Sequence, residues 1–499
     1  MNTKHTTNSA KAMCWSVLTQ IAPKLVTPIV NMILARLLAP EAFGAIATIN
    51  IVITFAEIFT DAGFQKYLVQ HEFESNDELN NATNVAFWTN ILVSAFFVSG
   101  IFIFRNPIAS FVGNPDLGGA IAVSSINIFL VTLSSTQTAR YNRSMDFKTL
   151  FYARICTVLI PLIVTVPLAI LMRNYWALII GTLITNFLHM LILTAFSKWK
   201  PKLYFSAKLF KDMFGFSSWL LLDAIAIWFT AYIGSFIVGR QMDDYYLGLY
   251  KTSITTVNSI TGIITMAIAP VMFSELSRFQ DNDVDMKAVF YKYQRLSAII
   301  LIPLSLGIFV FKDLVTWILL GDQWLEATGF IGIWGLISTI SILFTNFCST
   351  YYRSKGKPKI ALLTQIAFLV VLIPSIILSV KHGFEALYYT RSFVLIIQMI
   401  LYSLVMKFVF DFKLLKMILN ILPMVISAIV MGIIGYALKS LMVSYAWNLI
   451  CVAICVLVYF LVLFLFPKIR REMLSIPFID NFLRNYDSEK AANLNRRKP

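Results

Sequence analysis

The stretch that decides the fold runs from Trp15 to Gln70 and reads WSVLTQIAPKLVTPIVNMILARLLAPEAFGAIATINIVITFAEIFTDAGFQKYLVQ. It holds two long apolar segments that both carry polar residues at helical spacing. These are Gln20, Lys24, Thr27 and Asn31 in the first segment, and Asn50, Thr54, Glu57, Asp61 and Gln65 in the second. Successive members of each set are three or four positions apart, so each set is predicted to lie along one face of a helix.

Three of these residues, Lys24, Glu57 and Asp61, are charged although they stand inside apolar segments. Exposing an ion to lipid at mid-helix costs roughly 2.5–3.5 kcal/mol even on the lower insertion scales. The two polar faces are therefore expected to meet protein or a water-filled path. A buried Lys–carboxylate pair that only locks the two helices together is one interpretation. A functional path is the other, and it is favoured because ionisable groups inside membranes usually mark function.

The composition of the whole chain is that of a membrane protein. Of its 499 residues, 58% are hydrophobic and 13% are charged, and the mean hydropathy is +0.75. Apolar segments of about 20 residues, each long enough to cross a bilayer core as a helix, recur from end to end. We predict an all-α polytopic membrane protein with about fourteen transmembrane helices, at 12–35, 42–65, 83–104, 117–138, 150–172, 174–196, 212–238, 245–273, 293–311, 326–350, 359–380, 383–406, 416–438 and 443–466.

The positive charges alternate from loop to loop. The net charge is +15, but most of the 41 lysines and arginines fall on one side of the predicted helices. The other side holds Arg36, Arg105, Arg173, Arg240, Lys312, Lys381 and Lys439. Such an alternation places both termini in the cytoplasm and requires an even number of helices. The charge is thus explained by topology and by attraction to anionic membrane lipids, and no nucleic acid partner is expected.

An internal repeat divides the chain into two lobes. A shift of 204 positions lays Trp15 on Trp219, Arg36 on Arg240 and Gly44 on Gly248, and a shift of 210 lays Tyr141-Asn-Arg-Ser144 on Tyr351-Tyr-Arg-Ser354. We predict two six-helix lobes in a pseudo-twofold repeat, as in many transporters, plus two extra C-terminal helices. The predicted boundaries are 1–205 for the N-lobe, 206–410 for the C-lobe, 411–466 for the extra helices and 467–499 for a basic cytoplasmic tail.

The helix at 245–273 carries its own polar face, so both lobes are expected to line a hydrated cavity. The predicted residues of the substrate path are Lys24, Lys251, Arg154, Arg391, Asn31 and Asn258. The predicted ion-coupling residues are Glu57, Asp61 and Asp223. Alternatively, Arg154 and Arg391 reach only to the membrane interface, and Asp223 is satisfied by a neighbouring Ser218 or Trp228.

Motifs for other chemistry are missing from the sequence. It has no phosphate-binding Gly-Lys-Ser/Thr loop, no nucleophile motif and no cluster of histidines and cysteines. Neither a cofactor nor a metal is therefore expected, and the chain is not expected to be an ATP-driven pump. His189 could take part in a proton relay, but a lone histidine on an apolar helix is more often a packed residue.

Three stretches of the sequence carry a family resemblance. They are Leu34-Ala-Arg-Leu-Leu-Ala-Pro-Glu-Ala-Phe-Gly44, Phe59-Thr-Asp-Ala-Gly-Phe-Gln65 and Leu319-Leu-Gly-Asp-Gln-Trp-Leu325. The chain resembles the Wzx-type flippases of O-antigen and exopolysaccharide repeat units, within the multidrug/oligosaccharidyl-lipid/polysaccharide exporter superfamily. Relatives often read Asp-Leu-Gly where this chain has Asp61-Ala-Gly63.

The resemblance implies a flippase in the bacterial cytoplasmic membrane, not an enzyme. Its implied substrate is an oligosaccharide linked to undecaprenyl pyrophosphate, moved from the inner to the outer leaflet by alternating access, with polymerase or export machinery as possible partners. A cation-coupled multidrug antiporter of the same superfamily is the alternative, and it would favour an anionic cavity. A membrane-embedded glycosyltransferase or polymerase would bring a long extramembrane loop, and the sequence has none.

Overall fold

A computed structural model describes residues 3–474 of the chain, apart from 62 and 443. The elements of the first part are α1 (Thr3–Leu37), α2 (Pro40–Asp61), α3 (Phe64–Gln70), α4 (Asn76–Ile103), α5 (Arg105–Phe111), η1 (Pro115–Leu117), α6 (Gly118–Arg143), α7 (Phe147–Ile163), α8 (Thr165–Met172) and α9 (Tyr175–Phe196). They are followed by α10 (Ala207–Gln241), α11 (Asp244–Arg278), α12 (Asp283–Val310), α13 (Lys312–Leu319), η2 (Asp322–Ala327), α14 (Thr328–Ile342), α15 (Asn346–Ser354), α16 (Pro358–Val380), α17 (Phe384–Phe410), α18 (Leu414–Lys439), α19 (Tyr445–Phe464) and α20 (Pro467–Leu474).

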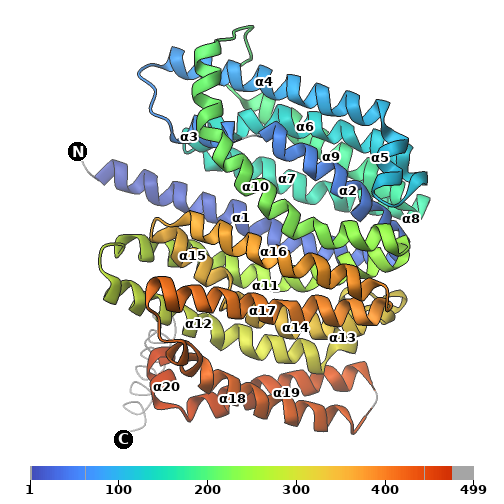
Figure 1. The fold of residues 1–499 in the computed structure, drawn as a ribbon, viewed down its shortest axis with the longest axis vertical. Helices are drawn as coiled ribbons and strands as arrows, with labels where there is room; N and C mark the ends of the chain where they lie inside the picture. The colour runs from blue at the N-terminus through green and yellow to red at the C-terminus, as the bar shows by residue number, and fades with distance from the viewer. Residues whose placement is uncertain (1–2, 62, 443, 475–499) are drawn as a thin grey trace, which may run out of the picture.

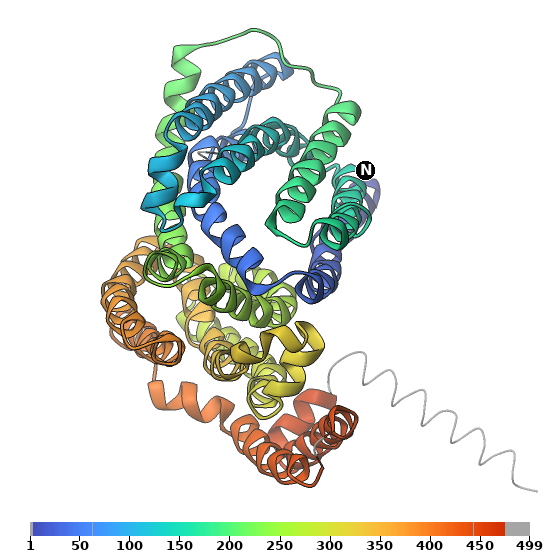
Figure 2. The ribbon, with the colours of Figure 1, turned by 90° about the vertical axis from the view of Figure 1, so that its right-hand side faces the viewer.

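The long helices lie side by side and run from one end of the molecule to the other (Figure 1). α3, α15 and α20 lie at the end where the described chain begins, and α5, α8 and α13 lie at the opposite end. We call these the N-terminal end and the far end of the bundle. Seen from the far end, α1–α9 form one group and α12–α17 form another (Figure 2). The all-helical, polytopic class predicted from the sequence is confirmed.

Most of the predicted membrane spans coincide with long apolar helices. Twelve helical segments of the described chain are long and apolar enough to cross a membrane. The two predicted spans that are not among them lie in α1 and α10, which are 35 residues long each and run alongside the others (Figure 1). The predicted total of fourteen therefore stays a prediction.

Two predicted spans are interrupted for local reasons. The second ends at Asp61, because Gly63 adopts a left-handed backbone with φ 80°, after which α3 begins at Phe64. The fifth is split into α7 and α8 at Val164. Pro167 explains this break, because its ring clashes with the carbonyl of the residue four positions earlier, Ile163, where α7 ends.

Side-chain caps fix where several helices begin. Before α4, Ser75 accepts a 3.1 Å hydrogen bond from the N–H of Glu78. Asn174 accepts from the N–H of Trp176 before α9, and Asp243 accepts from the N–H of Tyr246 before α11, both at 3.0 Å. Such caps satisfy amide groups that have no partner inside the helix. Two of them fix the starts of α9 and α11, which both lie at the far end.

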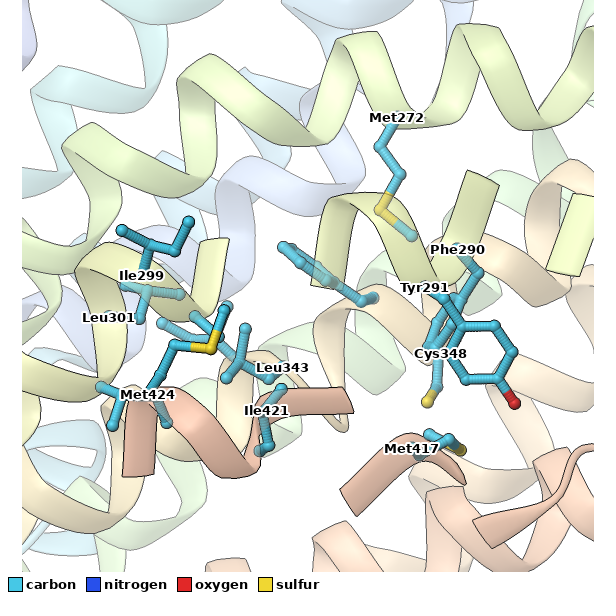
Figure 3. Close-up of a cluster of buried hydrophobic side chains, with 14 of the residues drawn as sticks. Met272, Phe290, Tyr291, Ile299, Leu301, Leu343, Cys348, Met417, Ile421 and Met424 are labelled. Carbon is cyan, nitrogen blue, oxygen red and sulfur yellow. The ribbon is translucent and has the colours of Figure 1, made fainter. Parts of the chain in front are cut away.

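The last two long helices pack on α12. Buried apolar side chains from α11, α12, α15 and α18 meet there, among them Met272, Phe290, Cys348 and Met424 (Figure 3). The Tyr459 hydroxyl of α19 donates a 2.9 Å hydrogen bond to the carbonyl of Ile299. α18 and α19 are thereby attached to the side of the C-terminal group.

Candidate functional site

A cavity of about 700 Å³ lies between the first group of helices and the long helices α10 and α11. Its walls come from α1, α2, α7 and α9 on one side and from α10 and α11 on the other, with Thr165 of α8 and Leu320 completing them. Its polar lining residues are Thr27, Asn31, Asn50, Arg154, Thr157, Thr165, Thr182, Thr185, Asn186, Tyr232, Lys251, Thr252, Thr255 and Thr256. The lining is therefore rich in hydroxyl and amide groups although it lies inside apolar helices.

Helical spacing brings these groups to the cavity. On α1, Pro23, Thr27 and Asn31 are spaced four residues apart and line one face. On α11, Lys251 and Thr255 have the same spacing, and so do Thr182 and Asn186 on α9. Residues at this spacing share a helix face. The predicted polar stripe of the first helix thus contributes Thr27 and Asn31 to the site.

The charge of the cavity is positive. Arg154 and Lys251 line it, and no carboxylate stands among the described residues of its wall. The ammonium of Lys251 lies 4.4 Å from the centre of the Tyr232 ring, which gives it a cation–π contact. A cavity of this kind attracts anions and can offer hydrogen bonds to a hydroxylated ligand.

Arg391 lies behind the cavity wall instead of on it. It is 9% exposed, its Nε donates a 3.1 Å hydrogen bond to the Tyr250 hydroxyl, and its guanidinium lies 4.7 Å from the centre of the Trp334 ring. Its Nη1 is buried without a hydrogen-bond partner in the described structure. Arg391 is close enough to Lys251 for the two charges to repel each other, so it adds to the positive potential on this wall.

A chain of amides connects the cavity to Glu57. Asn186, which lines the cavity, donates a 2.5 Å hydrogen bond from Nδ2 to the Oδ1 of Asn127. The Nδ2 of Asn127 donates a 3.0 Å hydrogen bond to the Glu57 carboxylate. Glu57 therefore does not line the cavity but contacts α6. Two hydrogen bonds, through Asn127 and Asn186, connect its carboxylate to the cavity wall.

The remaining predicted residues lie elsewhere. Lys24 and Asn258 are exposed and do not line the cavity, although Pro23, Thr27 and Thr255, their near neighbours, do. Asp61 is the last residue of α2, and Asp223 belongs to α10; the side chains of both lie outside the described part of the structure. The roles of all these residues stay predictions.

The far end of the cavity is closed where α2 crosses α11. A Cβ atom added to Gly44 would lie 1.8 Å from the carbonyl oxygen of Asp244, and one added to Gly248 would lie 1.9 Å from that of Pro40. Each glycine thus lets its helix touch the backbone at the start of the other helix. Gly44 and Gly248 are also the two positions that the predicted sequence repeat treats as equivalent.

Side chains reinforce this closure from both groups of helices. The amide of Asn114 donates to the carboxylate of Asp244. In return, the indole N–H of Trp324 donates a 2.7 Å hydrogen bond to the carbonyl of Ala35, which also accepts from Gln323. The guanidinium of Arg36 donates to the carbonyls that end α13, at 3.0 and 3.2 Å. We call these contacts, with the glycine crossing, the far-end clamp.

Several of these residues were missed from the sequence. Asn127 and Asn186 are not among the site residues predicted from the sequence, although the spacing of Thr182, Thr185 and Asn186 indicates a polar stripe on the segment 174–196. Gln323 and Trp324 were noted only as part of a family motif. The structure shows them to be clamp residues that bind the end of α1.

A family model described as "Polysaccharide biosynthesis protein" matches residues 33–329. Among curated proteins, the succinoglycan biosynthesis transport protein ExoT of Rhizobium meliloti (strain 1021) is 22% identical over 337 residues, which are 68% of this chain and 67% of the relative. The lipopolysaccharide biosynthesis protein WzxC of Escherichia coli (strain K12) is 22% identical over 332 residues, 65% of this chain and 63% of the relative. The chain thus aligns with about two-thirds of the length of these relatives.

The fold is similar to solved transporter structures. The lipid II flippase MurJ in an inward closed conformation aligns with a TM-score of 0.75 and 15% identity, covering 91% of this chain and 99% of the other. An inward-facing multidrug resistance MATE family transporter of the MOP superfamily aligns with a TM-score of 0.58 and 11% identity, covering 79% and 98%. At this level of identity the likeness concerns the fold.

Proposed function

Because this chain belongs to the polysaccharide biosynthesis protein family, we propose that it is a flippase for an oligosaccharide linked to undecaprenyl pyrophosphate. It moves this lipid from the inner to the outer leaflet of the bacterial cytoplasmic membrane during the synthesis of O-antigen, capsule or exopolysaccharide. The family and the fold are those of transporters and not of enzymes. The curated relatives named for succinoglycan and lipopolysaccharide support the class of substrate.

The observation that carries the proposal is the positive, hydroxyl-rich cavity. Its charged lining residues, Arg154 and Lys251, lie on opposite walls, in α7 and α11. A pyrophosphate between them would receive charge-assisted hydrogen bonds from both, and Arg391 would strengthen the field behind Lys251. The threonine and asparagine side chains suit the hydroxyl groups of sugars. An organic cation, the substrate class of a multidrug antiporter, would be repelled by the same walls.

The lipid tail needs a way out of the cavity toward the bilayer. A small gap lies between α1 and α11. Its lining residues are Pro28, Asn31, Met32, Thr256, Ser259, Ile260, Leu319 and Leu320. Asn31 and Thr256 line both this gap and the cavity, so the two spaces adjoin. We place the head group in the cavity and the polyprenyl tail in the lipid beside this gap.

Transport requires that the cavity open alternately to the two sides. We place both termini in the cytoplasm, as the charge alternation predicts, which puts the far-end clamp on the external side and makes the proposed state one that is closed to the outside. Lys24 lies beside Pro23 at the cytoplasmic edge of the cavity, and Asn258 lies further along α11 toward the same side, where the substrate would approach. Glu57, with Asp61 and Asp223, is proposed to bind the coupling ion, and the Asn127–Asn186 chain would transmit its protonation to the cavity wall.

Export of polysaccharide by cells that depend on this chain tests the proposal. Lys251→Gln and Arg154→Gln should each reduce export about tenfold or more, because a charge-assisted hydrogen bond contributes roughly 1.5–3 kcal/mol. Lys251→Arg keeps the charge and should restore part of the activity. Lys381→Gln removes an exposed lysine outside the cavity and is the matched control.

Binding to the purified chain separates the two candidate substrates. The affinity of undecaprenyl pyrophosphate should be higher for the parent protein than for the Lys251→Gln variant. Ethidium, an organic cation, should not bind the parent protein. Full export by both Gln variants at normal protein levels, or ethidium binding that Lys251→Gln strengthens, would favour the drug antiporter instead.

A further inference from the structure

A second cavity of about 490 Å³ opens at the N-terminal end of the bundle, away from the space between the two groups of helices. It is formed by the start of α4, the end of α6 and the segment that follows α9. Its lining residues are Asn76, Leu79, Arg140, Tyr141, Arg143, Ser144, Asp146, Phe196, Ser197, Lys198 and Trp199. Its volume lies in the range of ligand-binding pockets.

Basic side chains outnumber acidic ones in the lining of this cavity. Arg140, Arg143 and Lys198 line it, and none of them takes part in an ion pair in the described structure. Asp146 also lines it, but its carboxylate is occupied at the start of α7, where it accepts hydrogen bonds from the N–H and the hydroxyl of Thr149 at 3.1 and 2.8 Å. With three basic residues and one carboxylate, the lining keeps a net positive charge that favours the binding of an anion.

The two guanidinium groups are held in fixed positions. The Nη1 of Arg140 donates to the Oδ1 of Asn80 at 2.9 Å. The Nη1 of Arg143 donates to the carbonyls of Leu68 and His71 at 2.8 and 2.6 Å. In the part of the chain that the structure describes, these bonds use one nitrogen of each group and leave Nη2 and Nε for a ligand. Two such forks match the oxygen atoms of a phosphate.

The rest of the lining suits an amphiphile. Phe196, at the rim, is 70% exposed, and Leu79 adds a second apolar side chain. Trp199 is buried against Phe87, with ring centres 5.6 Å apart. Aromatic residues at the level of the lipid head groups are typical of membrane interfaces. An acyl chain could thus lie along Phe196 while its head group occupies the charged part of the cavity.

We propose that this cavity binds the phosphate of an anionic phospholipid from the cytoplasmic leaflet. The proposal rests on the orientation given above, which places the N-terminal end of the bundle in the cytoplasm. Basic pockets between helices on that side of a membrane are suited to such head groups. The bound lipid would join α4, α6 and the segment after α9, and it lies outside the proposed substrate path.

Native mass spectrometry of the purified full chain with added phosphatidylglycerol tests the site. Lys198→Gln should weaken phosphatidylglycerol binding about fivefold, the effect of one basic residue near an anionic head group. Lys198 is exposed and makes no hydrogen bond or ion pair in the described structure, so the variant should fold. Arg140→Gln should lower binding further, and Arg140→Lys should restore part of it. Lys208→Gln, an exposed lysine of α10 at the same end of the bundle, should bind as the parent does.

Two further probes distinguish the sources of the phosphate. Phosphatidylethanolamine, which carries a phosphate without net charge, should bind weakly and respond little to Lys198→Gln. Inorganic phosphate at millimolar concentration should not displace phosphatidylglycerol. Displacement by inorganic phosphate, or equal loss of binding in Lys198→Gln and Lys208→Gln, would overturn the proposal. Because no translocation is measured, these outcomes do not depend on the proposed flippase activity.

Discussion

Replacing Gly44 with alanine should open the closed end of the cavity. The new Cβ would lie 1.8 Å from the carbonyl oxygen of Asp244, whereas an ordinary van der Waals contact begins at 3.4 Å. The helices α2 and α11 must therefore separate by about 1.6 Å at their crossing, the difference between these two distances. Backbone atoms form both sides of the contact, so no side chain can rotate to relieve it.

The cost of this overpacking to the closed state is about 1–3 kcal/mol, which shifts the equilibrium between closed and open states about 5- to 150-fold. A single cysteine at Thr252, a lining residue that is 9% exposed, reports the change once the native cysteines have been replaced. A membrane-impermeant maleimide applied to intact cells should label Thr252→Cys faster when Gly44→Ala is also present.

Matched variants make this experiment specific. Gly248→Ala should have the same effect as Gly44→Ala, because its Cβ would lie 1.9 Å from the carbonyl oxygen of Pro40. Gly100→Ala, in α4, meets nothing within 4 Å and should leave the labelling rate unchanged. If labelling stays at the parent rate in both clamp variants at normal protein levels, the glycine crossing does not close the external side.

Three further predictions concern topology, coupling and the clamp. A cysteine at position 312 should be labelled from outside intact cells and one at position 200 only after permeabilisation; external labelling at 200 would reverse the map. Glu57→Gln keeps the size of the side chain and the oxygen that accepts from Asn127, but the glutamine side chain cannot ionise. At an unchanged protein level, export should therefore fall and should no longer depend on pH. An export rate equal to that of the parent across pH would limit Glu57 to a structural role. Arg36→Ala removes two hydrogen bonds to carbonyls at the end of α13 and should raise external labelling of the cavity less than Gly44→Ala does.

The all-helical membrane class of the protein and the positions of most of its helices along the chain could be predicted from the sequence, because both depend on local properties. A run of about 20 apolar residues has few alternatives to a membrane-spanning helix. The helical repeat then decides which residues share a face, and it correctly grouped Thr27 with Asn31 on α1. Breaks inside the predicted spans were harder to foresee, since the effect of Pro167 falls four residues earlier, at Ile163.

Which faces meet was decided by the tertiary structure alone. The spacing along α2 places Glu57 on a polar face, but its partner, Asn127, is 70 positions away on α6. Likewise, Arg154 of α7 and Lys251 of α11 line one cavity although the two helices lie far apart in the sequence. Helical periodicity sets the direction in which a side chain points from the helix axis. The neighbour that the side chain meets depends on how closely two helix backbones approach, and the sequence of either helix alone does not determine that distance.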